Sequence, residues 1–396
     1  MMKPGGCPER HDMIARLIAQ DTVTSRGRAE LDHSNRPVID LIAEWAEGLG
    51  FSVQVLPVPE RPGKSNLIAS LGRGPGGLVL AGHADTVPCD PDRWSMDPFT
   101  ATERGGRLYG LGACDMKSFL ALALEAGGRY TQTRLTKPLH LVVTADEETD
   151  MSGARALASA NALQADAAVV GEPTNLRPIR MHKGIIMERV QLVGQSGHSS
   201  DPAYGNSALE GAYEALSALR SLRAELQAEF YDGSFRVPVP TLNLGQIRGG
   251  DNPNRICGEC EIAYDVRLLP GMDASAIRDR VRARLTAALA GSGLELHFEA
   301  LSDGTPAAAT PANALIVQAA EELTGHPAGA VAFGTEAGYY QRQGMDVVVL
   351  GPGSIAQAHQ PDEYVPLDQL DRTVELLDAL IERFCLQRPH AVEQAV

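Results

Sequence analysis

"GLVLAGHADTVP" (residues 77–88) is a short, branched, apolar run that ends in a histidine and an aspartate, His83 and Asp85. Such a run is typical of a buried strand in a parallel sheet. Residues two apart on a strand point to the same side, so both side chains can lie at its carboxyl end, where open α/β sheets carry their sites. The stretch alone fits a solvated polar pair as well as a metal-binding histidine oriented by a carboxylate.

The residues around this strand alternate between helical and strand patterns. Apolar residues recur with helical spacing in residues 12–20, 37–50 and 117–130. Short apolar strands are predicted at residues 65–71, 77–83, 139–145 and 166–172. This alternation predicts an α/β fold with a largely parallel sheet.

A different pattern follows "MHKG" (residues 181–184). Half-polar strands and two helices predict an α+β layer, with both helices on one face of an antiparallel sheet; the strands are at residues 185–194, 241–250, 260–270 and 294–300, and the helices at about 206–230 and 273–290. From about residue 302 the α/β pattern returns, with a helix at 313–325, a strand at 346–353 and a last helix at 368–385. We therefore predict an α/β domain in two parts, residues 1–181 and 302–396, interrupted by an inserted domain, residues 182–301.

Composition narrows the class of protein. A net charge of −15 over 396 residues argues against nucleic acid or an anionic membrane as the main partner. The N-terminal residues lack a signal-peptide pattern, and no apolar run approaches a membrane span. The six scattered cysteines fit reduced thiols in the cytoplasm, and we interpret the single C-x-x-C, Cys257 and Cys260, as structural. "GRGPGG" (residues 72–77) is followed by a strand rather than a helix, which argues for a turn and against a dinucleotide site.

Acidic residues and a second histidine stand at the other strand ends and helix starts of the α/β part. They are Asp115, Glu147, Glu148, Glu172 and His359. A parallel sheet would gather them with His83 along one edge. Each acid alone fits a helix cap or a solvated turn, but the set favours zinc, cobalt or manganese, with a carboxylate bridging two ions as in two-metal hydrolases.

Six motifs resemble, in order, those of the M20 metallopeptidases. They are "GHADTVP" (82–88), "GLGACDMKS" (110–118), "ADEETDMSGA" (145–154), "GEPT" (171–174), "GHSS" (197–200) and "GPGSIAQAHQPDEY" (351–364). The resemblance covers residues 10–385, with the insertion where the family keeps its dimerisation or lid domain. It implies that the chain forms a homodimer through the inserted domain.

The resemblance also implies roles for individual residues. One Zn²⁺ would be bound by His83 and Glu172 and, where both sites are filled, a second by Glu148 and His359, with Asp115 bridging; Co²⁺ is an alternative. Asp85 would hydrogen-bond the His83 ring, and Glu147 would be the general base that later protonates the leaving amine. His198, which is otherwise an ordinary loop histidine, would donate a hydrogen bond to the oxyanion, from the partner subunit unless the lid moves.

The expected substrate is a small N-acyl amino acid, because the motifs are most similar to those of members that deacetylate a basic amino acid. Arg255 has a planar fork that fits an α-carboxylate, and Asn254 can add a hydrogen bond; Arg267 is interpreted as a framework residue. Glu336 could meet a substrate ammonium or equally well stabilise a helix N-terminus.

The expected activity is metal-dependent amide hydrolysis. Another N-acyl amino acid, a succinylated diamino acid or a dipeptide remain possible substrates. A non-catalytic relative that binds an acyl amino acid is disfavoured, because every ligand position and the base position are filled.

Overall fold

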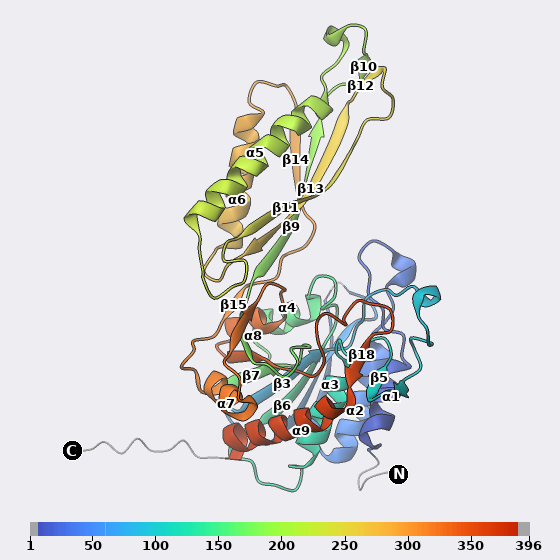
Figure 1. Ribbon diagram of the computed structural model, residues 1–396, viewed down its shortest axis with the longest axis vertical. Helices are drawn as coiled ribbons and strands as arrows, with labels where there is room; N and C mark the ends of the chain where they lie inside the picture. The colour runs from blue at the N-terminus through green and yellow to red at the C-terminus, as the bar shows by residue number, and fades with distance from the viewer. Residues whose placement is uncertain (1–6, 60, 387–396) are drawn as a thin grey trace, which may run out of the picture. The chain divides into compact units, whose positions relative to one another are not determined.

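The computed structural model describes residues 7–59 and 61–386, and the chain forms two compact units (Figure 1). The first unit comprises Met1–Arg180, Thr310–Gly329 and Thr335–Val396, and the second comprises Met181–Ala309 and Ala330–Gly334. Each unit has a hydrophobic core of its own. The predicted fold class, an α/β part interrupted by a separate antiparallel part, is confirmed.

A mixed sheet forms the centre of the first unit. In the described part of the chain its strand order is β1 (Ser52–Pro57), β2 (Ser65–Leu71), β6 (Leu139–Thr144), β3 (Leu78–His83), β7 (Ala167–Val170), β17 (Asp346–Val349), β8 (Ile179–His182) and β15 (Ala308–Ala309), with β16 (Gly329–Val331) beside β8. The central strands β6, β3, β7 and β17 are parallel, as predicted. The outer strands are antiparallel to their neighbours, so parallel pairing is confined to the centre.

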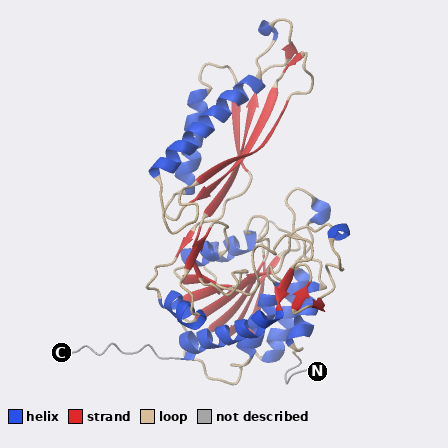
Figure 2. Ribbon diagram, in the orientation of Figure 1, coloured by secondary structure: helices blue, strands red, loops and turns tan. Residues whose placement is uncertain are grey.

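Helices cover both faces of this sheet (Figure 2). They are α1 (Arg10–Ile18), α2 (Arg36–Leu49), α3 (Lys117–Gly128), α4 (Ser152–Ser159), α7 (Leu315–Thr324), α8 (Ala337–Arg342) and α9 (Leu367–Ile381). The α3 sequence is apolar on nearly all sides, and α3 packs against β3, α1 and α9, which leaves it almost wholly buried. Helices α4 and α8 pack together on the opposite face of the sheet (Figure 1).

Shorter elements complete the first unit. A small sheet joins β18 (Tyr364–Pro366), β5 (Arg107–Tyr109) and β4 (Thr102–Arg104), and short turns of other helix types lie at Ala29–Leu31, Pro91–Arg93 and Glu382–Leu386. Among the residues described, no helix combines the length and the apolar character needed to cross a membrane.

The second unit is the predicted two-layer arrangement. Its antiparallel sheet has the order β11 (Thr241–Gly249), β13 (Glu259–Leu268), β9 (Gly184–Val193) and β14 (Glu295–Ala300), and its helices are α5 (Ala208–Glu229) and α6 (Ala274–Ala288). Burial alternates along β9 and β13, because one face of the sheet packs on the helices and the other does not. A separate ribbon pairs β10 (Gly197–His198) with β12 (Arg255–Ile256), near a short turn at Pro202–Tyr204.

Candidate metal centre

The polar residues that follow the parallel strands of the first unit lie together at the carboxyl ends of those strands. His83 ends β3 and pairs in register with Thr144, which ends β6, so the turn that carries Glu147 and Glu148 begins beside it. Strand β7 ends two residues before Glu172. His359 follows β17 in a loop, in a left-handed backbone conformation with φ 60°.

Asp115 lies between the two histidines. Its Oδ1 is 3.1 Å from Nε2 of His83, and its Oδ2 is 3.6 Å from Nε2 of His359. Glu148 is 3.0 Å from Nε2 of His359, and Oε1 of Glu172 is 3.9 Å from Nε2 of His83. The predicted ligand residues are therefore gathered as two histidine–carboxylate groups that share Asp115.

Burial and the closeness of several carboxylates disfavour the ionised form of the glutamates in this cluster. Burial raises the pKa of Glu147 and of Glu172 well above the usual value, and for each a neighbouring carboxylate raises it further. Burial alone would lower the pKa of His83, but its hydrogen bond to Asp115 contributes to raising it well above the ordinary value. The hydrogen bond to Glu148 raises the pKa of His359 to about 9. A bound cation would stabilise the ionised carboxylates that the protein alone disfavours.

The donor set fits a divalent metal. Ligand atoms of His83, Glu147 and Glu172 lie within 4.8 Å of one another, and so do those of His83, Asp115 and Glu148. Oε1 of Glu172 is buried and has no hydrogen-bond partner among the described residues, as expected of an oxygen that would bind a metal ion. Nδ1 of His83 lies 3.0 Å from the carbonyl oxygen of Asp85, which can only accept, so a neutral ring carries its hydrogen on Nδ1. The lone pair of Nε2, which lies on the side of Asp115, could then bind an ion.

The carboxylate of Asp85 has a different role from the predicted one. Its Oδ1 is 3.7 Å from the His83 ring, and its two oxygens accept hydrogen bonds from the backbone N–H groups of Glu147, at 3.2 Å, and Glu148, at 3.1 Å. The expectation that this carboxylate bonds the ring is therefore corrected, because the backbone carbonyl does so. Asp85 instead holds the turn that presents both glutamates.

Glu363 supports the site and was not predicted from the sequence. Its fully buried carboxylate accepts hydrogen bonds from the backbone of Gly112, Cys114 and Asp115, at 3.0, 2.7 and 2.9 Å. Burial raises the pKa of Glu363 to about 8, Asp115 adding to the increase and these backbone hydrogen bonds opposing it. Its position in "QPDEY", four residues after His359, was the one available signal.

Glu336 is buried rather than exposed to solvent. It is fully buried at the start of α8 and accepts a hydrogen bond from the hydroxyl group of Thr144. Its Oε2 has no hydrogen-bond partner among the described residues. Burial raises the pKa of Glu336 to about 7, against the opposing effect of Thr144.

The second unit brings together the other predicted residues. His198 pairs in register with Arg255 on the β10–β12 ribbon, and Ser199 donates its N–H to the carbonyl of Asn254. The N–H of Ser200 donates to Nδ1 of His198 at 3.2 Å, so a neutral ring carries its hydrogen on Nε2.

Comparison with known proteins gives a consistent result. Residues 79–383 match the family described as "Peptidase family M20/M25/M40". An acetylornithine deacetylase of Proteus mirabilis (strain HI4320) is 45% identical over 375 residues, which cover 95% of this chain and 96% of that protein. An acetylornithine deacetylase of Edwardsiella ictaluri (strain 93-146) is 46% identical over 93% of this chain and 96% of its own length. The crystal structure of an M20 family metallo-carboxypeptidase from Sulfolobus solfataricus has the same fold, with a TM-score of 0.75 at 17% identity over 95% of this chain and 99% of that one.

Proposed function

The chain belongs to peptidase family M20/M25/M40, and on this premise we propose that it hydrolyses N2-acetyl-L-ornithine to acetate and L-ornithine, a step towards arginine. The observation that carries the proposal is the 45–46% identity, over nearly the full length of both chains, to relatives named acetylornithine deacetylase. The metal centre described above supports amide hydrolysis as the reaction.

The ligands of the proposed Zn²⁺ ions, for which Co²⁺ can substitute, follow from the two groups around Asp115. His83 and Glu172 would hold one ion, Glu148 and His359 a second, and Asp115 would bridge them. Imidazole and carboxylate ligands suit both metals. When bound, such ions polarise the amide carbonyl and lower the pKa of water.

Glu147 is the proposed general base. One of its oxygens lies within 4.8 Å of ligand atoms of His83 and Glu172, so the carboxyl group borders the reacting space. It would take the proton of the attacking water and deliver it to the leaving amine. Because Asp85 accepts the backbone N–H groups of both glutamates, it would fix the turn from which Glu147 and Glu148 project.

The residues proposed to bind the substrate lie on or beside the β10–β12 ribbon. The Nε2–H of His198 is available to donate to a developing oxyanion, a contribution of about 3 kcal/mol to the barrier. Arg255 is exposed and pairs with Asp251 at 2.6 Å, an exposed ion pair that a substrate carboxylate can replace at little cost, and Asn254 can add a hydrogen bond. Arg267 is paired with Asp265 on its own strand, which supports a framework role.

The sequence left two roles open for Glu336, contact with a substrate ammonium and stabilisation of a helix N-terminus. Its position directly before α8, its complete burial and its hydrogen bond with Thr144 favour a structural role at the start of α8 over contact with a substrate ammonium.

A homodimer in the cytoplasm completes the proposal. Strand β11 is an edge strand of the second unit, and exposed apolar side chains lie on it and on the neighbouring α5, namely Ile247, Leu209 and Tyr213. An unpaired edge beside exposed apolar residues supports pairing with a second copy. All six cysteines lie within the described residues and none forms a disulfide, which supports a reducing compartment.

A substrate panel tests the proposed function. Metal-free protein is assayed before and after addition of Zn²⁺ or Co²⁺ with acetylornithine, acetylcitrulline, acetylmethionine, succinyl-diaminopimelate and a dipeptide. We expect activity only with metal, and the highest kcat/KM for acetylornithine. Faster hydrolysis of another member of the panel would replace the substrate, and no hydrolysis by the metal-loaded protein would overturn the proposal.

A further inference from the structure

The residue directly before the two glutamates is itself buried and charged. Asp146 is fully buried and has a left-handed backbone conformation, with φ 60°. Its side chain accepts hydrogen bonds from the hydroxyl groups of Thr24, at 2.9 Å, and Ser152, at 2.8 Å. A buried carboxylate is costly unless it is paired, so the fold must supply positive charge to it.

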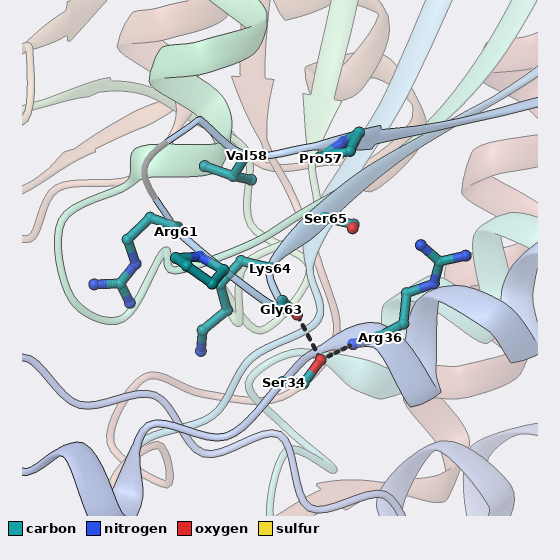
Figure 3. Close-up of a pocket in the computed structure, with 9 residues that line it drawn as sticks. Ser34, Arg36, Pro57, Val58, Arg61, Gly63, Lys64 and Ser65 are labelled. Carbon is teal, nitrogen blue, oxygen red and sulfur yellow. Dashed lines mark hydrogen bonds between the residues drawn. The ribbon is translucent and has the colours of Figure 1, made fainter.

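Two cations of the β1–β2 loop supply that charge. Nε of Arg61 is 2.9 Å from Oδ2 of Asp146, and Nζ of Lys64 is 3.2 Å from Oδ1. Figure 3 shows both side chains beside a pocket of about 460 Å³, with their charged ends on one side of the loop and away from Arg36. Asp32, which is only partly buried, pairs with the same two cations at 3.2 and 2.8 Å.

The backbone of Asp146 also starts the turn that carries the glutamates. Its carbonyl oxygen accepts N–H groups from Thr149, Asp150 and Met151, so the turn closes on this residue. The side chain of Asp146 thus ties the first residue of the turn to three separate segments of the first unit, through Thr24, the β1–β2 loop and Ser152.

We propose that Asp146 is a positioning residue for Glu147 and Glu148, and that Lys64 and Arg61 serve as its fixed counter-ions. Thr24, Ser152, Lys64 and Arg61 hold Asp146 in place, and Asp85 accepts the N–H groups of the next two residues. Together these contacts fix the backbone of the turn and so the directions in which the side chains of Glu147 and Glu148 point. The inference rests on the proposed function only in calling Glu147 the general base and Glu148 a metal ligand. The positioning itself concerns the shape of the turn.

The pair Asp146→Asn and Asp32→Asn tests this inference. Both variants remove one carboxylate charge from the same two cations, but Asp32 makes no hydrogen bond or ion pair with the turn within the described part of the chain. Asparagine tolerates the left-handed conformation, so Asp146→Asn changes the charge and not the backbone preference. Each metal-free variant is titrated with Co²⁺, followed by the visible absorption of the bound ion, and kcat and KM for acetylornithine are then measured.

We expect Asp146→Asn to weaken Co²⁺ binding and to lower kcat, each by about 10–100-fold, with an altered absorption spectrum and a nearly unchanged KM. Asp32→Asn should keep the wild-type spectrum, affinity and kcat even if its melting temperature falls. Lys64→Arg, which keeps the charge, should retain more Co²⁺ affinity than Lys64→Met.

Equal changes in both aspartate variants would overturn the inference, because they would show only a shared loss of the ionic cluster. An unchanged Asp146→Asn would do the same. If Asp146→Asn does not fold, Ser152→Ala decides, since it removes one donor to Asp146 without unpairing a charge and should shift the Co²⁺ spectrum in the same direction. The Co²⁺ titration needs no substrate, so it tests the positioning role even if acetylornithine is not hydrolysed.

Discussion

Glu147 and Glu148 are neighbours in the chain, yet the proposed reaction needs one as a base and the other as a ligand. Glu147→Gln should leave the metal content nearly intact and lower kcat at least about a hundredfold, because it removes only proton transfer. His83→Ala should lose metal as well as activity. Metal content by elemental analysis, together with steady-state kinetics, separates the two outcomes. Loss of metal from Glu147→Gln would show that Glu147 is the ligand and Glu148 the base. Glu147 is close enough to His83 and Glu172 to bind the same ion as they do.

Glu336 allows a second test at the scale of one side chain. Because it is fully buried and bonded to Thr144, we expect Glu336→Gln to lower kcat/KM for acetylornithine and acetylmethionine by the same factor. A selective loss on acetylornithine would instead show that Glu336 meets the side-chain ammonium, which acetylmethionine lacks. Full activity on both substrates would give it neither role.

At the scale of the element, the loop that carries Asp115 depends on a residue far along the chain. Glu363→Gln replaces one accepting oxygen by an NH₂ group that faces a backbone N–H. We expect about 1–3 kcal/mol less stability for the metal-free protein, because a buried backbone N–H group loses its acceptor. We also expect weaker metal binding, because Asp115 is no longer held in place. Denaturant unfolding and metal titration measure the two effects.

The neighbouring Asp362→Asn is the control for this variant, since Asp362 accepts the N–H of Ser95 at the surface. It should leave metal binding unchanged. If it lost metal to the same extent as Glu363→Gln, the effect would belong to the whole loop and not to the three hydrogen bonds of Glu363.

Strands and their acidic ends were predictable from sequence because each leaves a local pattern. Strand direction leaves none: β2 is buried along almost its whole length like a central parallel strand, yet it is antiparallel to both neighbours. The half-exposed edge strand β1 was not predicted. Glu363 was missed for a related reason, since its partners lie about 250 residues earlier and are backbone N–H groups, which have no signature in sequence.

At the scale of the whole molecule, activity would be a property of two chains if His198 acts in the site of the partner subunit, as the family resemblance implies. Glu147→Gln and His198→Ala subunits should each be nearly inactive alone. After mixing and subunit exchange, a hybrid dimer contains one site with an intact Glu147 and an intact partner His198, so part of the activity should return. Exchange is verified with differently tagged subunits. No recovery in verified hybrids would place His198 in its own subunit's site or outside catalysis.

The position of β17 has a consequence for how the protein is made. This strand lies between β7 and β8, although residues 183–345 separate it from β8 in the chain. In the described residues the partners of β8, which are β15, β16 and β17, are all translated after it. At about 5–20 residues per second, a ribosome leaves β7 and β8 with open edges for about ten to thirty seconds. Exposed strand edges attract other chains, so the nascent chain is most in need of a chaperone while its insert is being translated.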